Sequence, residues 1–159
     1  MAAFPSSDAI SVLAFDFGTH KIGVAIGQSL TQSAKALPEL KARDGQPNWD
    51  EIAALLEEWQ PDAFVVGIPI NMDGSEFELT HRARKFGKRL HGRFGKPCFE
   101  MDERLSSFDA RDHVRSEHGS SKHGYPGKQK HTLVDSVAAS LILQSWFNDQ
   151  WPDIKNKNN

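Results

Sequence analysis

Three acidic residues of this chain stand in apolar surroundings, where a carboxylate costs the most free energy. Asp16 ends one apolar run, Glu103 follows a second, and Asp135 lies inside a third. Carboxylates are seldom buried unless they are paired or bind a metal. If the fold brings the three together, their mutual repulsion favours a hard divalent cation with oxygen ligands. The sequence therefore predicts a Mg²⁺ or Mn²⁺ site at Asp16, Glu103 and Asp135.

The first two acids also have purely structural interpretations. Asp16 could begin a turn through its side chain, because Asp favours such positions. Glu103 could be a loop acid paired with Arg104, and Asp102 could then be the ligand in its place. These residues alone leave both acids open, and Asp102 stays as a supporting candidate.

Asp135 has the strongest structural alternative. It follows Thr132 with the spacing of a capping box, so its carboxylate could stabilise a helix N-terminus. Ala138, Ala139 and Ile142 share its helical face, and small residues there would let the helix approach a sheet. Capping and metal binding can coexist at this position.

Positive charge is concentrated in one segment, although the whole chain has a net charge of −2. Seven Lys or Arg and no acid lie between Leu79 and Phe99, on a segment whose apolar residues keep helical spacing. Such a run can be a solvated face or a surface that contacts phosphates. We expect these side chains to face outward, and we select Arg82, Arg84, Lys85, Lys88 and Arg89 as candidate nucleic-acid contacts.

A second acid-free window runs from Gly119 to Val134. Its glycines, serines and proline predict a mobile basic loop up to His131, with Lys122, Lys128 and Lys130 as further candidate contacts. Tyr125 and Phe108 could stack on bases, although lone aromatic residues more often belong to a core. A zinc site is disfavoured, because His118, His123 and His131 lack the usual spacing and have no cysteine partners.

Size and composition are those of a soluble globular protein. With 159 residues and 38% hydrophobic content, we expect a single domain over residues 1–159, with its core at about 10–148. There is no apolar run near the roughly 18 residues that a membrane span needs, and no secretion signal is visible. The single cysteine, Cys98, reads as a buried structural thiol in a reducing cytoplasm.

The order of expected elements indicates an α/β fold with a mixed sheet. A hairpin is expected from strands 11–16 and 21–27, followed by a weaker third strand and a helix that Asn48 caps and Pro61 ends. Strand 63–68, the basic helix, strand 97–101, a helix from Ser106 to about His118 and a last helix from Thr132 complete the series. Residues 153–159 are expected to be disordered.

Four segments, in order, resemble the successive motifs of the YqgF (RuvX) family. They are Asp16 to Ala25 (DFGTHKIGVA), Val65 to Gly74 (VVGIPINMDG), Asp102 to Ser107 (DERLSS) and Val134 to Leu143 (VDSVAASLIL). The resemblance covers about residues 13–147. It departs from the usual pattern at Leu105-Ser106-Ser107, where the family has Leu-Thr-Thr or Leu-Ser-Thr, a change that keeps a hydroxyl.

The resemblance implies a ribonuclease H-like fold related to Holliday junction resolvases, with three antiparallel N-terminal strands, then parallel strands, and flanking helices. Members of the family are described as resolvases or as nucleases that trim the 5′ end of pre-16S rRNA. It also implies that Asp16, Glu103 and Asp135 are the catalytic acids. We therefore expect a metal-dependent nuclease, a hydrolase acting on ester bonds.

Phosphodiester hydrolysis fits this set of residues. Two divalent ions about 4 Å apart can stabilise both the attacking and the leaving oxygen. Asp16 would bridge them, Glu103 and Asp135 would each complete one site, and Arg104 or a loop lysine would offset phosphate charge. The expected partners are nucleic acid, either precursor rRNA or structured DNA, and ribosomal particles, for a protein that is monomeric or weakly dimeric.

Two rival functions come from other classes. The segment beginning at Asp16 also resembles the phosphate-binding turn of actin-like and sugar-kinase ATPases, but those need two such domains and this chain has room for one. The other rival is a catalytically silent RNA-binding module for ribosome assembly. The presence of all three acids argues against a catalytically inactive protein.

Overall fold

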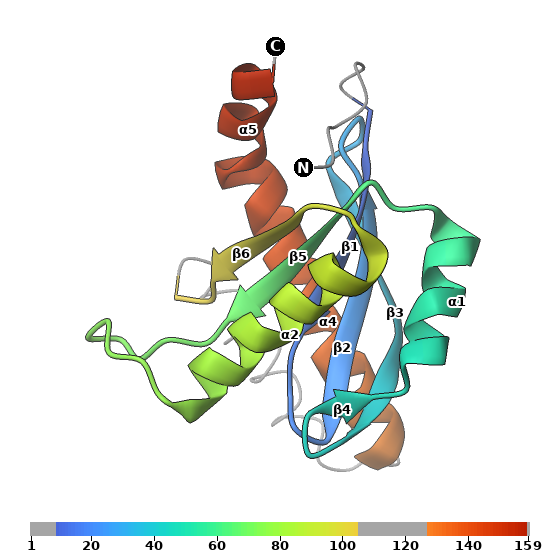
Figure 1. Ribbon diagram of the computed structural model, residues 1–159, viewed down its shortest axis with the longest axis vertical. Helices are drawn as coiled ribbons and strands as arrows, with labels where there is room; N and C mark the ends of the chain where they lie inside the picture. Colours follow the sequence, from blue (N-terminus) through green and yellow to red (C-terminus); the bar gives the residue numbers. More distant parts are fainter. Residues whose placement is uncertain (1–8, 105–126, 159) are drawn as a thin grey trace.

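The computed structural model describes residues 9–104 and 127–158, and within them the side chains of residues 9–104 and 136–156. Its elements run in the order β1 (Ser11–Asp16), β2 (Lys21–Gln28), β3 (Ser33–Arg43), β4 (Gln46–Pro47), α1 (Trp49–Trp59), β5 (Ala63–Ile68), α2 (Glu78–Phe94), β6 (Cys98–Asp102), α4 (Gly127–Asp149) and α5 (Trp151–Asn158). The strands form one sheet in the order β4-β3-β2-β1-β5-β6 (Figure 1). Strand β1 pairs antiparallel with β2 and parallel with β5, so the mixed sheet that we expected is confirmed.

The third strand is longer than the sequence suggested. Strand β3 has 11 residues, and its pairing with β2 shifts in register between Ile22 and Val24. Val24 pairs with Leu37 and Ile22 with Leu40, so Pro38 falls in the irregular part. A proline has no N–H for the ladder, and a bulge is where a strand accommodates it. The sequence predicted a weaker third strand because of its polar residues and Pro38. The structure has a strand of 11 residues, because the register shift accommodates Pro38 without ending the strand.

A tight turn that the sequence analysis did not identify joins β3 to β4. Asp44 and Gly45 both have positive φ values, 48° and 79°, and they connect the paired residues Arg43 and Gln46. Two consecutive left-handed residues are typical of a type I′ hairpin turn, for which Asp-Gly is a favoured sequence. The Gly45 N–H donates to the carbonyl of Thr19 at 2.8 Å, which holds the turn against the segment after β1.

The two central helices begin and end close to where the sequence indicated. The Asn48 side chain accepts a hydrogen bond from the Asp50 N–H at 2.9 Å, and α1 ends at Trp59, which is followed by Gln60 in the left-handed conformation. Helix α2 begins after Phe77, whose N–H donates to the hydroxyl of Thr80. That hydroxyl donates in turn to the carbonyl of Pro69, so the start of α2 is tied to the loop after β5.

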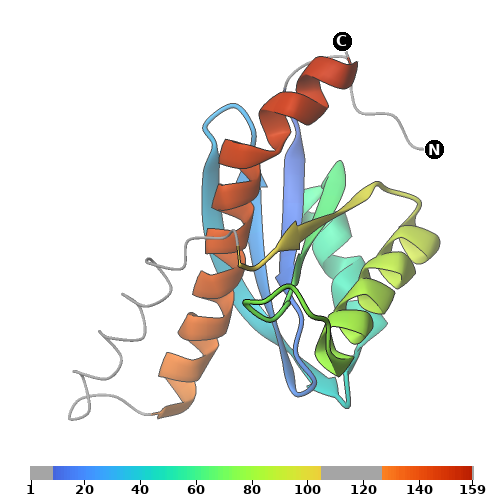
Figure 2. The ribbon, with the colours of Figure 1, turned by 90° about the vertical axis from the view of Figure 1, so that its left-hand side faces the viewer.

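The sheet separates two apolar layers. Alternate residues of the central strands, including Phe15 and Phe64, pack against α1 and α2 on one face, and α2 contributes Phe86 to this layer. The other residues of the same strands pack against α4 and α5 on the opposite face, and α4 contributes Trp146 and Phe147 to this layer. Figure 2 shows α4 and α5 on one side of the sheet and α1 and α2 on the other. Within the described ranges, no helix is long and apolar enough to cross a membrane.

The C-terminal part corrects two expectations. The last long helix begins at Gly127 and not at Thr132, so residues 127–131 of the expected basic loop are helical. The tail that we expected to be disordered from Asp153 is helical as α5. Trp151 is 5% exposed and Ile154 packs on the same apolar layer, so burial of these two side chains offsets the polar composition of the tail. The helix expected from Ser106 to His118 lies outside the described residues.

Candidate active site

Asp16 is the last residue of β1, at the centre of the sheet. It pairs with Gly23 on β2 and with Gly67 on β5. Paired residues on neighbouring strands project to the same face, so the Asp16 side chain has a glycine on either side. The carboxylate is half-buried. Residues Val12 and Ala14, which alternate with it, belong to the layer under α4, and Asp16 therefore faces the α4 side.

Glu103 reaches the same place from the end of β6. Its N–H donates to the carbonyl of Ile68 at 3.0 Å, which fixes the backbone beside β5. A methyl carbon built at Gly67 would lie 3.0 Å from Oε1 and 3.2 Å from Cγ of Glu103. The Glu103 carboxylate therefore lies over Gly67, the strand neighbour of Asp16. Two of the three predicted acids therefore lie on one face of the sheet, where strands β1 and β6 end.

Helix α4 covers this face. The Cδ1 atom of Ile142 would lie 2.5 Å from a methyl carbon at Gly67, so the helix packs directly on the glycine beside Asp16. Asp135 lies within α4, seven residues before Ile142 and four before Ala139, and both of these are fully buried. Helical periodicity places position 135 on that same sheet-facing side. The side chain of Asp135 lies outside the described set.

Asp102 forms an ion pair with Arg104. The Arg104 Nη2 atom lies 2.7 Å from Asp102 Oδ2, and its Nε lies 3.1 Å from the same oxygen. The Arg104 backbone N–H also donates to Asp102 Oδ1, at 2.9 Å. Hydrogen bonds from the guanidinium lower the pKa of Asp102 below its usual range, although partial burial opposes the shift. Asp102 thus holds Arg104, while Glu103 is the acid that lies over Gly67.

The loop after β5 borders Arg104. Asp73 accepts hydrogen bonds from the backbone N–H and the hydroxyl of Ser75, which lower the pKa of its carboxyl. A methyl carbon at Gly74, where φ is 89°, would lie 3.5 Å from Arg104 Nη1. The loop therefore keeps its tip beside the guanidinium. Met72, at that tip, is 75% exposed.

The basic residues of α2 divide between two sides of the helix. Arg84 pairs with Glu76 and with Glu100, so acids already neutralise that side. These hydrogen bonds raise the pKa of Arg84 and lower that of Glu76. Arg93 instead stacks on Trp49, with its guanidinium carbon 4.2 Å from the ring centroid. Part of the basic charge of α2 is therefore already used in contacts within the fold.

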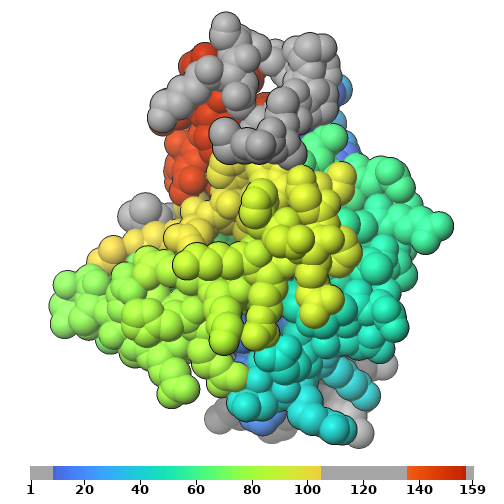
Figure 3. Space-filling view, in the orientation of Figure 1, coloured from blue at the N-terminus to red at the C-terminus, as the bar shows by residue number. Residues whose placement is uncertain are grey.

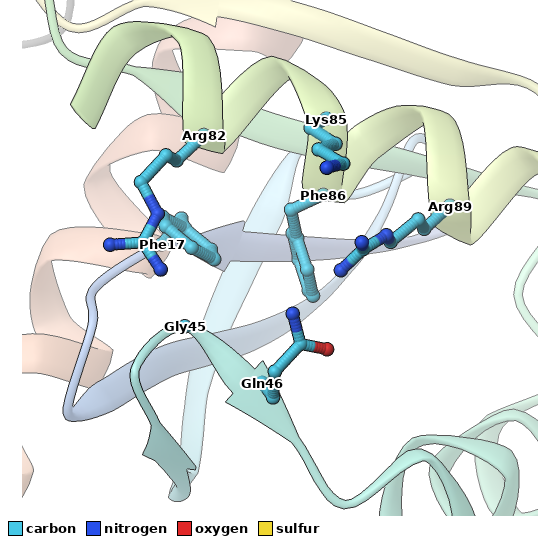
Figure 4. A pocket seen from close by; sticks show the side chains of 7 residues that line it. All are labelled: Phe17, Gly45, Gln46, Arg82, Lys85, Phe86 and Arg89. Carbon is cyan, nitrogen blue, oxygen red and sulfur yellow. The ribbon is translucent and has the colours of Figure 1, made fainter. Parts of the chain in front are cut away.

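A pocket opens on the other side of α2. It is lined by Phe17, Gly45, Gln46, Arg82, Lys85, Phe86 and Arg89, and Figure 4 shows the cations of α2 above the turn that carries Gly45. In the space-filling view, a hollow separates α2 from the β3–β4 segment (Figure 3). Lys88 is exposed and does not line the pocket.

Several of the predicted nucleic-acid contacts lie outside the described side chains. Lys122 belongs to the segment between the two described ranges. Lys128 and Lys130 are in the first turns of α4, and only their backbone is described. Gly23, Gly67, Gly45 and Gln46 are site residues that the sequence analysis missed. The Asp-Gly pair at 44–45 was a usable signal for a hairpin turn, whereas the glycines beside Asp16 follow only from the strand register.

The donor set suits a hard cation. Among the described side chains no group of three possible ligands occurs, and Asp16 and Glu103 supply two carboxylates on one face. Oxygen donors of this kind are typical of Mg²⁺ and Mn²⁺ sites. The third predicted ligand, Asp135, is the one whose side chain is not described.

Comparisons with known proteins give a family. The family "RuvX: Holliday junction resolvase" matches residues 10–149. A protein of Aeromonas salmonicida (strain A449) named "Putative pre-16S rRNA nuclease" is 55% identical over 141 residues, which are 89% of this chain and 96% of that protein. A protein of the same name from Chromohalobacter salexigens is 56% identical over 138 residues, 87% of this chain and 89% of the other.

Solved structures of lower identity are also similar. The RuvC protein of T. thermophilus in complex with a Holliday junction substrate matches with a TM-score of 0.47 and 15% identity, covering 89% of this chain and 97% of that one. The yeast mitochondrial Holliday junction resolvase Ydc2 matches with a TM-score of 0.49 and 10% identity, covering 98% and 85%.

Proposed function

Because the chain belongs to the RuvX family, we propose that it is a divalent-metal-dependent nuclease that hydrolyses phosphodiester bonds in the cytoplasm, with precursor 16S rRNA as its substrate. Relatives at 55% and 56% identity carry the name of a pre-16S rRNA nuclease, which supports this substrate. The family description names Holliday junctions, so four-way DNA is the alternative substrate.

One observation carries the proposal. The carboxylates of Asp16 and Glu103 lie on the same face at one edge of the sheet, and the strand neighbours of Asp16 are Gly23 and Gly67. Two carboxylates on one face of the sheet repel one another, and a divalent cation bound by both offsets that repulsion. Gly23 and Gly67 add no side chain of their own beside Asp16, and Glu103 and Ile142 occupy the space over Gly67.

The proposed roles follow from charge and position. Asp16, Glu103 and Asp135 would hold the Mg²⁺ or Mn²⁺, which when bound supplies Lewis-acid stabilisation of charge on the phosphoryl oxygens. Arg104, oriented by two contacts with Asp102, would bind a non-bridging phosphate oxygen and hold the scissile group beside the carboxylates. The loop with Asp73 and Gly74 would limit the movement of Arg104.

The test uses two labelled substrates, precursor 16S rRNA and a four-way DNA junction, each with Mg²⁺, Mn²⁺ or EDTA. We expect cleavage of the rRNA with metal and none with EDTA. Faster cleavage of the four-way junction than of the rRNA would show that DNA is the preferred substrate. If the purified protein binds rRNA and cleaves neither substrate with either metal, the silent RNA-binding alternative replaces the nuclease.

The Asp16→Asn variant tests the site itself. It removes a charge and keeps the shape, so we expect at least a tenfold loss of turnover with an unchanged thermal midpoint. Asp153→Asn in α5, an exposed position far along the chain, is the matched control and should keep full turnover. If Asp16→Asn retains more than about one-tenth of the activity, Asp16 is not a metal ligand.

A further inference from the structure

The pocket beside α2 is not needed by the carboxylate site, and it has a definite construction. Its cavity measures about 120 Å³. Arg82, Lys85 and Arg89 are at spacings of three and four residues, so they lie on one face of α2. Gln46 and Gly45 of the β3–β4 turn form the opposite wall, and the Gln46 amide points towards the helix (Figure 4). Three cations and an amide thus surround one small cavity.

The floor of the pocket is apolar. Phe17 is 7% exposed and Phe86 is 3% exposed, and their ring centroids lie 5.2 Å apart. An apolar wall excludes water and lowers the local dielectric, which strengthens the attraction of nearby cations for an anion. A solvated lysine face on an ordinary helix has no such floor.

The charge of the pocket is poorly compensated by the protein. Among the described residues, neither Lys85 nor Arg89 forms an ion pair. Arg82 contacts Asp44, with Nη2 3.1 Å from Oδ1, but the Asp44 side chain is 86% exposed. Exposed ion pairs contribute little, so this contact is easily replaced by a stronger anion. By contrast, Arg84 on the other side of α2 has two acidic partners.

The position of Arg82 is built into the fold. Its Nη2 atom also donates to the carbonyl of Asp44 at 2.5 Å, and a methyl carbon at Gly45 would lie only 2.8 Å from that nitrogen. Gly45 has a φ of 79°, which favours glycine in any case. The turn therefore lets the guanidinium rest against the backbone at the rim of the cavity, where its remaining N–H groups are oriented before a ligand arrives.

We infer that this pocket binds a single phosphate group of the nucleic-acid strand, on the face of the sheet opposite to the carboxylates. A phosphate group has the charge for three cations and accepts hydrogen bonds from guanidinium, ammonium and amide donors. The inference rests on the proposed function for the identity of the strand. Phe17 follows Asp16 directly but belongs to the apolar layer under α2, so the two sites share one edge of the sheet.

Two parts of a nucleic acid carry such a phosphate group: the interior of the chain and a phosphorylated end. Both present the same phosphoryl oxygens to the pocket. Internal contacts require only a backbone, whereas an end-binding pocket requires a terminal monophosphate. Oligonucleotides that carry a 5′-phosphate, a 3′-phosphate or only hydroxyl ends separate the two sources.

The experiment measures binding without cleavage. A labelled single-stranded RNA of mixed sequence is titrated in EDTA with the wild type, Lys85→Gln and Lys88→Gln. The two variants remove the same charge from exposed positions three residues apart on one helix, so a diffuse positive field predicts equal losses. The pocket predicts that Lys85→Gln weakens binding at least about fivefold more than Lys88→Gln. Equal losses would overturn the inference.

Competition by inorganic phosphate gives a second readout. At matched ionic strength, phosphate should displace RNA from the wild type and from Lys88→Gln more effectively than chloride does. In Lys85→Gln, phosphate and chloride should displace RNA equally well. If phosphate is more effective than chloride by the same factor in all three proteins, the inference of a phosphate-binding pocket is wrong. These binding measurements need no cleavage, so they test the pocket separately from the nuclease activity. If the protein is not a nuclease, cleavage is absent but Lys85→Gln still weakens RNA binding more than Lys88→Gln does. If the pocket does not bind phosphate, the two variants bind RNA equally well.

Discussion

Gly67 is the residue that joins the proposed catalytic acids to the fold. It pairs with Asp16, lies under the Glu103 carboxylate and contacts Ile142 of α4. In Gly67→Ala, the new methyl carbon would lie 2.5 Å from Ile142 Cδ1 and 3.0 Å from Glu103 Oε1. We expect a stability loss of about 1 to 3 kcal/mol from overpacking, together with lower turnover because Glu103 must move.

The matched control is Gly92→Ala. Gly92 is a helical glycine of α2 with open space around its Cβ position, so alanine there should stabilise the protein by about 0.5 to 1 kcal/mol and leave turnover unchanged. Urea unfolding and cleavage rates measure both variants. Full activity in Gly67→Ala would mean that the position of Glu103 does not limit the reaction.

The pair of Asp102 and Arg104 should produce a specific pH dependence. Because the pKa of Asp102 is lower in the folded protein than in the unfolded chain, the pair stabilises the fold above the unfolded pKa of about 4 and loses this contribution as pH falls through the folded value. Asp102→Asn should therefore lower the thermal midpoint at pH 7, and its difference from the wild type should shrink below about pH 4.

A double-mutant cycle checks that the contribution comes from this pair. Arg104→Gln should have a similar effect on stability at pH 7, and combining it with Asp102→Asn should add little. Additive losses, or a difference from the wild type that stays constant down to pH 2, would assign the effect to other contacts of the two residues.

At the scale of elements, the sequence predicted best where the signal was local. The apolar run 63–68 lies between Pro61 and Pro69, and β5 has these bounds. Strand β3 was underestimated, because its pairing around Pro38 depends on a bulge that only the partner strand defines. The glycines beside Asp16 were missed for the same reason, since register is a long-range property. Asp16 and Glu103, which the structure brings to one face of the sheet, were selected because Asp16 ends an apolar run and Glu103 follows one.

Helix α5 is the element for which local composition was misleading. Its Asp, Lys and Asn residues suggested disorder, but Trp151 is 5% exposed and its ring centroid lies 5.8 Å from that of Trp146. We predict that Trp151→Ala costs about 3 kcal/mol in urea unfolding, because it removes a large side chain from the apolar layer under α4. Asp153→Ala, at an exposed position in the same helix, should change stability by less than about 0.5 kcal/mol. Equal, small effects would return residues 151–158 to a disordered tail.

At the scale of the whole molecule, net charge is a poor guide to the partner. The chain carries −2 overall, yet three cations of α2 surround one pocket while Arg84 on the other side of the helix is paired with acids. The folding of the β3–β4 turn against α2 creates this asymmetry. Attraction of an anionic strand therefore depends on local potential at one edge of the sheet, and it should weaken steeply with added salt.

The two proposed sites lie on opposite faces of the sheet at the C-terminal end of β1. One nucleic-acid chain can therefore contact both sites only by passing around that end of the sheet. A substrate too short to do so would lose the phosphate contact in the pocket and keep the contacts at the carboxylates. We predict that kcat/KM rises in a step as the strand is lengthened on one side of the scissile bond. A charged hydrogen-bonded contact contributes about 1.5 to 3 kcal/mol, so the step should be roughly 10- to 100-fold.

The step can be assigned to the pocket by repeating the length series with variants. Lys85→Gln should reduce the step at least about fivefold and leave the rate on the shortest cleaved substrate unchanged, whereas Lys88→Gln should keep the full step. A rise that is gradual and equal on both sides of the scissile bond would indicate diffuse attraction along the strand. A step that survives undiminished in Lys85→Gln would place the additional phosphate contact elsewhere on the molecule.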